Sequence, residues 1–312
     1  MNEVAKREKT ISERFTEAVA REFSSVSGEM VQFSPNQKRL AQHLFVKADA
    51  ALKDLEKKRI SDNKMNLAPY VWKNINMQKM STDAIHRIEI GLDALIPNHL
   101  SMIPYWNKRL EKYDLDLQIG YAGKDYYRRK MAFDEPIDMI YELVFSNDIF
   151  EPIKKGSGVQ VESYKFEIPK PFDRGPVVGG FGYIVYKDQT KNKLIIVTET
   201  DFVKSMGEAK SKTFWNKHPE AMRYKTIVNR TTDKLLIDPE KTSVSFFEVE
   251  HAEYENGETA EPDFADQIID IDPKEVKEVE SEKEEVEEIP EEKAEENAEP
   301  IDDIQRELEP DF

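Results

Sequence analysis

Lysine and arginine residues interleaved with aromatic residues are the clearest chemical feature of this sequence of 312 residues. One such segment runs from Tyr105 to Lys130 and a second from Lys204 to Lys234. Cations can follow the phosphates of a nucleic acid while rings stack on its bases, as binding of a single strand without sequence preference requires. The alternative is a pair of solvated basic faces over an ordinary aromatic core. The candidate DNA contacts are Tyr105, Lys108, Tyr121, Lys124, Arg128, Arg129, Lys130, Lys210, Lys212, Trp215, Lys217, Arg223, Lys225, Arg230 and Lys234.

A helix is expected over 219–236, and it separates the basic from the apolar residues of the second segment. At about 100° per residue, Arg223, Arg230 and Lys234 fall within about 40° of one another. Ala221, Val228 and Leu235 gather on another, apolar side of the same helix. Pro219 begins the helix, so its first N–H groups are open to a phosphate. The spacing predicts a principal DNA contact, with an ordinary solvated outer face as the alternative.

Motifs of common enzyme classes are missing from the sequence. There is no G-x-x-x-x-G-K-[ST], G-x-G-x-x-G, G-x-S-x-G or H-E-x-x-H. The absence of cysteine excludes disulfides, thiolate metal sites and a cysteine nucleophile. The five histidines have no metal-ligand spacing, and Asp114 and Asp116 are explained by a neighbouring turn. We therefore expect no enzyme, no catalytic residue and no metal site.

Charge divides the chain into a basic body and an acidic tail. Residues 248–312 hold 28 acidic and 5 basic residues, so the whole-chain charge of −17 leaves +6 on residues 1–247. The tail has few large apolar residues and repels itself, which predicts disorder over 248–312. At its end, over 301–312, apolar residues stand among acidic ones. This stretch is either a solvated chain end or a short docking peptide.

Hydrophobic periodicity predicts an α+β body in which helices precede and follow mostly antiparallel strands. The N-terminus lacks a secretory signal, and no apolar run nears the roughly 18–20 residues of a membrane span. The expected domains are a helical region 1–82, a DNA-binding core 83–247 and the tail. Helices are expected at 11–25, 35–59, 83–95, 121–133, 200–206 and 219–236, and strands at 99–106, 115–120, 137–145, 159–166, 181–187 and 193–198.

Five blocks between Asp83 and Ile237 together resemble the RecT family of phage and prophage annealing proteins. Their order and spacing carry the resemblance, although Asn229, Thr231 and Thr232 depart from the family pattern. The blocks are Gly91-Leu92 to Ile103-Pro104-Tyr105; Gln118 to Gly123, followed by Arg129 and Lys130; Val144, Asp148 and Phe150; Gly182-Tyr183 to Lys187-Asp188; and Trp215, Glu220, Met222, Lys225, Thr226 and Arg230.

The resemblance implies a protein that binds single-stranded DNA and anneals complementary strands without ATP in phage-type recombination. It implies an antiparallel hairpin sheet packed with helices around a basic groove, and self-assembly into rings or helical filaments. Implied partners are single-stranded DNA, the annealed duplex intermediate, a phage exonuclease and a host single-strand-binding protein, in the cytoplasm of a bacterial host and without a membrane. No cofactor is implied, although Mg²⁺ could support annealing.

Two other functions remain compatible with the residues. The first is a passive single-strand coat that protects DNA without pairing it. The second is a metal-dependent nuclease, for which a divalent-ion site among Asp and Glu residues would be needed. Mixing complementary oligonucleotides separates annealing from passive coating, because only an annealing protein speeds their pairing.

Overall fold

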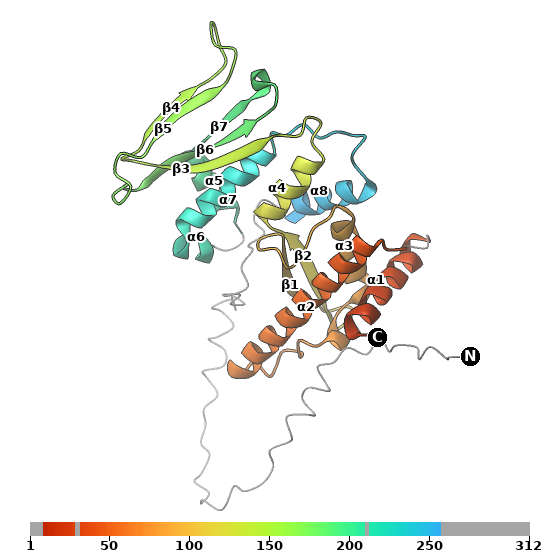
Figure 1. The fold of residues 1–312 in the computed structure, drawn as a ribbon. Coiled ribbons are helices and arrows are strands. Elements are labelled where there is room, and N and C mark those ends of the chain that lie inside the picture. The colour runs from red at the N-terminus through yellow and green to blue at the C-terminus, as the bar shows by residue number, and fades with distance from the viewer. Residues whose placement is uncertain (1–8, 29–31, 210–211, 257–312) are drawn as a thin grey trace, which may run out of the picture.

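The computed structural model describes residues 9–28, 32–209 and 212–256, and they form an α+β protein of two parts (Figure 1). The first part contains α1–α4, the β1–β2 hairpin and α8, packed around one hydrophobic core. The second part contains β3–β7 and α5–α7, whose three-stranded sheet has a hydrophobic core on each face. The predicted α+β class and antiparallel pairing are confirmed.

The first two helices begin where the sequence predicts, because their start signals are local. Thr10 and Ser34 accept hydrogen bonds from the backbone N–H three residues on, and each makes a complete capping box. The third predicted helix is displaced: it begins after its cap Asn76 and ends before Gly91, where φ is +88°. The helices are α1 (Ile11–Ser27), α2 (Pro35–Ser61) and α3 (Met77–Glu89), with the short η1 (Trp72–Asn74) between the last two.

A β-hairpin and two further helices complete the first part. The hairpin pairs Leu100 with Ile119 at one end and Asn107 with Lys112 at its turn. Met102, Leu115 and Leu117 are fully buried against the helices, so one face of the hairpin is core. The elements are β1 (Leu100–Asn107), β2 (Lys112–Ile119), α4 (Tyr121–Lys130) and α8 (Val244–Asn256).

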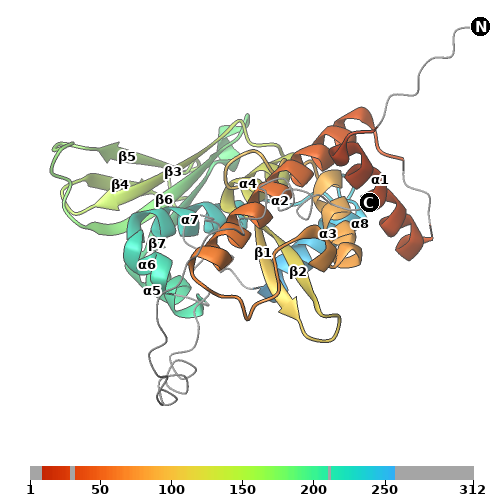
Figure 2. The ribbon, with the colours of Figure 1, turned by 90° about the horizontal axis from the view of Figure 1, so that it is seen from below.

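The second part is layered, with a sheet between a hairpin and helices (Figure 2). The sheet order is β3-β6-β7, with β4–β5 over one face and α5–α7 over the other. The elements are β3 (Asp138–Phe145), β4 (Ile149–Ile153), β5 (Ser163–Glu167), β6 (Val177–Val185), η2 (Gln189–Lys191), β7 (Lys193–Thr198), α5 (Glu199–Glu208), α6 (Thr213–Lys217) and α7 (Pro219–Thr232).

Alternating glycine and aromatic residues let the central strand β6 be covered on both faces. A Cβ at Gly182 would lie 1.8 Å from Thr231 Oγ1, so α7 approaches to the backbone of the strand. On the opposite face, the ring of Phe181 stacks on Phe150 of the β4–β5 hairpin with centroids 4.7 Å apart. The position of α7 is therefore fixed by close packing on the sheet.

Other elements differ from the sequence prediction where tertiary contacts decide. β4 and α6 were not predicted, β5 begins at Ser163 rather than at 159, and α7 ends at Thr232 rather than at 236. The predicted disordered tail is wrong over 248–256, because α8 continues to Asn256. Phe246 and Val249 are buried against the first core and hold this helix. The predicted disorder of 257–312 lies outside the described residues.

Candidate nucleic-acid interface

Helices α4 and α7 pack against each other where the two parts of the protein meet. Three half-buried tyrosines lie there in edge-to-face contact: the ring of Tyr224 on α7 lies 6.0 Å from Tyr121 on α4 and 6.3 Å from Tyr141 on β3. Burial raises the pKa of Tyr224 and of Tyr141 above the usual value, so both hydroxyls stay protonated at neutral pH. The junction thus carries aromatic rings and hydroxyl donors from three elements.

Arg128 is a structural residue of this junction. Its side chain is buried, with Nη1 2.5 Å from Glu250 Oε2 and Nε donating to the carbonyl of Thr232 at 3.2 Å. Burial acts to lower the pKa of Arg128, but the charge and hydrogen bond of Glu250, together with the nearby Tyr127 and Asp233, outweigh it, and the net pKa is raised. The guanidinium therefore joins α4 to the end of α7 and to α8.

Two more cations of α4, Arg129 and Lys124, also have acidic neighbours. Arg129 Nε lies 2.8 Å from Asp125, which also accepts a hydrogen bond from the Tyr141 hydroxyl. Lys124 Nζ lies 3.0 Å from Asp233 at the end of α7. These ion pairs fix α4 against the sheet and against α7, and they reduce the positive charge available to a ligand.

The predicted basic stripe of α7 is partly neutralised by α5. Arg223 Nη2 lies 2.8 Å from Glu199, and Arg230 Nη1 lies 3.4 Å from Asp201. Hydrogen bonds from Thr198 and the charge of Arg230 hold the pKa of Asp201 below its usual value, so this carboxylate is ionised at neutral pH. Lys234 is exposed beyond the last turn. The stripe exists, but two of its three cations face carboxylates.

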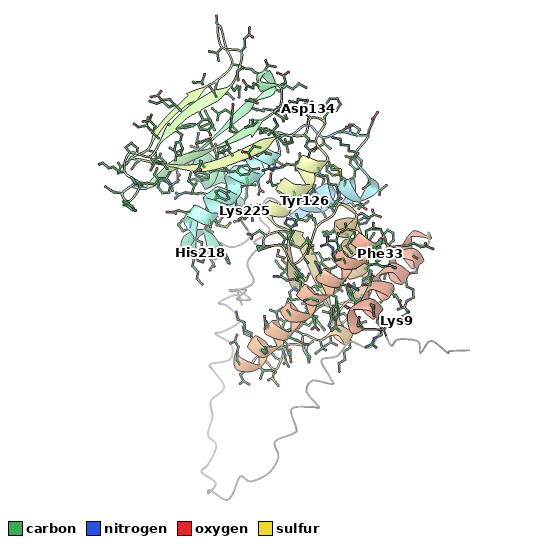
Figure 3. All side chains as sticks on the ribbon, in the orientation of Figure 1. Lys9, Phe33, Tyr126, Asp134, His218 and Lys225 are labelled. Atoms are coloured by element: carbon green, nitrogen blue, oxygen red, sulfur yellow. The ribbon has the colours of Figure 1, made fainter. Side chains whose placement is uncertain are left out.

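The start of α7 keeps the geometry predicted for an anion contact. Pro219 is at the first helical position, and His218 before it is exposed and makes no side-chain cap hydrogen bond (Figure 3). Lys217 is exposed beside it. On the anchoring side, Val228 and Leu235 are buried as predicted, whereas Ala221 is exposed and the prediction is wrong for it.

The remaining candidate residues are scattered over the structure. Trp215 and Lys225 are only 6% exposed, so both side chains are largely withdrawn from a ligand. Tyr105 and Lys108 are exposed near the turn of the β1–β2 hairpin, at the end away from α4. Lys130 and Lys212 are exposed, and Lys210 lies outside the described residues. The roles of all fifteen candidates in binding DNA stay predictions.

Sequence reasoning missed the acidic partners and two tyrosines of the junction. Asp125 could have been found, because it stands four residues before Arg129 on one helix. Glu250 could not, since 122 residues separate it from Arg128. The place of Tyr141 at the junction could not be predicted, because alternation along a strand indicates which face of the sheet a side chain is on but not which residues it contacts.

Two further observations concern metal binding and membrane spanning. Among the residues that the structure describes, no group of three or more His, Asp or Glu side chains is arranged to hold a metal ion. Within the same residues, no helix is both long and apolar enough to cross a membrane.

Exposed lysines near aromatic side chains are compatible with the class of nucleic-acid-binding proteins. The sequence profile of the RecT family matches residues 91–262, which is more than half of the chain, and the chain belongs to the RecT family. The match runs from Gly91 through both parts of the fold and past α8. The search of curated proteins found no match. Membership indicates a role in single-strand annealing during DNA recombination.

Proposed function

We propose that this protein binds single-stranded DNA through exposed lysines around the α4–α7 junction and anneals complementary strands without ATP. The observation that carries the proposal is the family match over the whole of this junction. The exposed cations of the candidate set in this region are Lys130 on α4, Lys212 directly before α6, Lys217 at the end of α6, and Lys234 after α7. Lysine binds a phosphate as a mobile point charge, which suits a strand that must be released.

Annealing needs the bases of the bound strand to stay free for pairing. Contacts to phosphates hold a strand without reading its sequence, whereas contacts to base edges would block a second strand. The three tyrosines of the junction offer ring edges and hydroxyls to sugars or bases at its margin. In this proposal the arginines position the helices, the lysines neutralise phosphates, and no covalent step occurs.

ATP independence, self-association and the cellular setting also belong to the proposal. The sequence contains no phosphate-binding loop motif, and the charge neutralisation described above needs no nucleotide. We propose that the protein assembles with copies of itself, receives DNA exposed by an exonuclease, and works in the cytoplasm of a bacterial cell. Mg²⁺ is proposed only as an aid to pairing, since it screens the repulsion of two strands.

The direct test mixes two complementary oligonucleotides, one carrying a fluorophore and the other a quencher, with and without the protein. We expect faster quenching without nucleotide, and also in EDTA. Slower pairing than in buffer would indicate a passive coat, and shortened labelled DNA would indicate a nuclease. Binding of one labelled strand should weaken as salt rises, with a slope of about −0.7 per phosphate neutralised.

A charge-matched pair of variants tests the location. Lys212→Ala with Lys217→Ala and Lys234→Ala should weaken strand binding at least tenfold at low salt, by removing three phosphate contacts. Lys38→Ala with Lys53→Ala and Lys57→Ala removes the same charge from exposed positions of α2. Equal loss in both variants would show that binding follows net charge and that the α4–α7 junction is not the site.

A further inference from the structure

The turn of the β1–β2 hairpin carries exposed aromatic and apolar side chains that the proposed DNA interface does not use. Tyr105, Trp106 and Leu110 are 48%, 43% and 43% exposed. They stand within six positions, around the turn between the two strands. Residues 105–112 are here named the hairpin tip. Tryptophan and tyrosine are enriched at surfaces that contact a partner, so this group of side chains indicates a binding surface.

The indole of Trp106 is supported from one side by two tyrosine rings. It is in edge-to-face contact with Tyr113, with centroids 4.9 Å apart, and Tyr113 stacks on Tyr70 at 4.6 Å. The Tyr113 hydroxyl donates to the carbonyl of Ala68 at 2.6 Å. The segment between α2 and α3 therefore fixes the place of Trp106 while part of the indole stays exposed.

The hairpin tip is positively charged. Lys108, Arg109 and Lys112 are exposed, and Glu111 is the acidic residue of the same turn, so residues 105–112 carry a net charge of +2. Cations around exposed rings favour a partner that combines negative charge with apolar groups.

The charges of the segments packed beside the hairpin tip do not reverse its sign. Lys73 is exposed, and Lys64 lies 3.3 Å from Asp62. Asp114 is half-buried and accepts hydrogen bonds from two asparagine side chains. The charge of Asp114 is thus offset by that of Lys73, and the net charge of the region stays positive.

Residues 301–312, which lie outside the described residues, have the chemistry that this surface favours. They contain five acidic residues and one arginine, a net charge of −4. Ile301, Ile304 and Leu308 stand three and four positions apart, the spacing that places side chains on one side of a helical turn. Phe312 adds an aromatic ring. Apolar side chains flanked by carboxylates complement exposed rings flanked by lysine and arginine.

The chain before residues 301–312 is long enough to reach the hairpin tip. α8 packs at the α4 end of the hairpin, where the ring of Phe246 lies 5.9 Å from that of Tyr127 (Figure 1). The eight residues of β1 span about 23 Å at roughly 3.3 Å per residue, which separates the tip from that end. Between Asn256 and Ile301 stand 44 residues, and a flexible linker of that length has a typical span of about 36 Å.

A second acidic stretch with apolar residues, 264–271, is less well placed. Only 7 residues stand between Asn256 and Phe264, and a flexible linker of that length typically spans about 15 Å, less than the length of β1. A tethered segment has a high effective concentration only at sites that its linker can reach. Reach therefore favours residues 301–312.

Single-stranded DNA is the alternative occupant of a basic and aromatic surface. The exposed cations of the proposed DNA interface lie around α4 and α7, whereas the hairpin tip lies at the end of the hairpin away from α4. Phosphates match the cations of the tip but not the aliphatic side chain of Leu110. Residues 301–312 match both, and their tether gives them an effective concentration of order millimolar.

We propose that the hairpin tip is the docking site of residues 301–312 of the same chain, with the apolar side chains against Trp106 and Leu110 and the carboxylates beside Lys108 and Arg109. The contact holds the acidic tail to the body at a place separate from the proposed DNA interface, and it withholds this segment from other proteins. It needs no DNA, so it does not depend on the proposed function.

The fluorescence of Trp106 reports the contact in the full chain. Trp72 and Trp215, the other two tryptophans, are only 5% and 6% exposed, so quenching by acrylamide measures mainly Trp106. Docking should shield Trp106 in the parent protein, and loss of docking should make it accessible. Trp106→Phe should abolish every difference between the variants below, which assigns the signal to this residue.

The tail variant exchanges three apolar residues of the segment for serine: Ile304→Ser, Leu308→Ser and Phe312→Ser. Its quenching constant should be at least twofold that of the parent, because the apolar anchors are lost. The melting temperature should stay within about one degree, which confirms that the body is unchanged. Quenching equal to that of the parent would overturn the proposal.

A matched variant removes three apolar residues from the nearer acidic stretch: Ile268→Ser, Ile269→Ser and Ile271→Ser. It should be quenched like the parent. Exposure of Trp106 in this variant but not in the tail variant would assign the site to residues 264–271 and would refute the assignment to 301–312.

A synthetic peptide of residues 298–312 tests the contact directly when it is added to the full-length tail variant. It should restore the shielding of Trp106 with a half-effect below about 1 mM, because a weaker peptide could not stay bound at the effective concentration of the tether. A peptide of the same composition in scrambled order should have no effect. Failure of the first peptide, or equal shielding by both, would rule out specific docking.

Variants of the hairpin test its charge. The tip variant, Lys108→Ala with Arg109→Ala and Lys112→Ala, should expose Trp106 at low salt as the tail variant does. The change Lys38→Ala with Lys53→Ala and Lys57→Ala removes the same charge from α2 and should leave Trp106 shielded. Equal exposure in both would mean that shielding follows net charge, against docking at the tip.

Protein concentration and an added oligonucleotide distinguish the other occupants. Shielding within one chain is independent of protein concentration. Shielding that is lost on dilution would identify a second copy, and shielding that requires single-stranded DNA would identify a nucleic-acid contact; either result overturns the proposal. Absence of DNA binding and annealing in the parent refutes the proposed function alone, because shielding of Trp106 is measured without DNA.

Discussion

Most arginines and lysines have different roles around α4 and α7, although Lys124 pairs with Asp233 as the arginines pair with their carboxylates. Arg128, Arg129 and Arg223 each face a carboxylate at 2.5–2.8 Å, whereas Lys130 and Lys234 are exposed. A guanidinium offers a rigid fork of donors that matches a carboxylate, which explains why arginines join elements here. The sequence predicted the cations but not this division, because partners such as Glu250 are brought near by tertiary structure. Counting basic residues therefore overestimates the charge available to DNA.

Glu250 should be important for stability because it satisfies two buried groups. It accepts from the Tyr127 hydroxyl and from Arg128. Glu250→Ala should lower the free energy of unfolding by about 2 kcal/mol, since the Arg128 guanidinium loses its counter-charge in a buried site. Urea denaturation measures the effect, and Glu248→Ala, at an exposed position of the same helix, should change it by less than about 0.5 kcal/mol. Equal effects would argue against a specific role for Glu250.

His99 should make stability depend on pH. It is 6% exposed, and its Nδ1 accepts from the backbone N–H of Asp93 at 3.5 Å. Burial lowers its pKa below the usual value, despite the nearby charge of Asp93. The unfolded chain then binds a proton more readily, so stability is complete above the ordinary histidine pKa and falls as pH drops below it.

Urea denaturation at several pH values between 5 and 7.5 tests this sign. His99→Gln should be less stable near neutral pH and should lose less stability on acidification. Part of the dependence should remain, because burial also lowers the pKa of His86. A variant with the same pH dependence as the parent would exclude His99 as a contributor.

Helices and strands that local sequence signals specify were predictable, whereas those held in place by contacts with distant residues were not. Capping boxes fixed the starts of α1 and α2, and alternation with turn residues predicted β7 to the residue. β4 and α8 escaped prediction because what holds them is distant: Phe150 packs on Phe181, and Phe246 packs in the first core. In the sequence, α8 also resembles the start of the acidic tail, because its acidic residues outnumber its two buried apolar residues, Phe246 and Val249.

Gly182→Ala should separate α7 from the sheet. The new Cβ would lie 1.8 Å from Thr231 Oγ1, and the neighbour is a rigid β-branched residue of a helix. We expect a loss of about 3 kcal/mol in the free energy of unfolding. Adding Thr231→Ala should restore part of it by removing the crowded atoms. Gly207→Ala, where a Cβ meets nothing within 4 Å, is the control. A tolerated Gly182→Ala would mean that the helix packs less closely than described.

The ion pairs between α5 and α7 should restrain DNA binding. Glu199→Gln removes the carboxylate that faces Arg223, and both side chains are partly exposed. The freed guanidinium should raise single-strand affinity roughly two- to fivefold at low salt, within the range of exposed ion pairs. Glu208→Gln, on an exposed position of the same helix, removes the same charge and is the control. If both variants gain equally, the gain reflects net charge and not the release of Arg223.

For the whole molecule, the α+β class and the family followed from order and spacing along the chain. The boundary between body and tail could not be predicted in this way, because the density of acidic residues rises before the packed structure ends. The family match runs to residue 262, and α8 ends at Asn256, so the body extends past the predicted boundary at 247. A chain cut after Phe247 would lose Val249 and Glu250 from the packed structure and would confuse loss of fold with loss of tail.

A cut after Asn256 is therefore the test of the acidic tail. Residues 257–312 hold 24 acidic and 5 basic residues, so the cut removes a charge of −19 and leaves α8 in place. A tethered polyanion competes with DNA at an effective concentration of order millimolar, so the shortened protein should bind single strands more tightly at low salt. The gain should fade as salt screens the tail from the lysines. Fluorescence anisotropy at several salt concentrations measures both effects, and an unchanged melting temperature confirms the fold. Equal affinity of the two proteins at every salt concentration would exclude competition and leave the tail as a site for recruiting another protein.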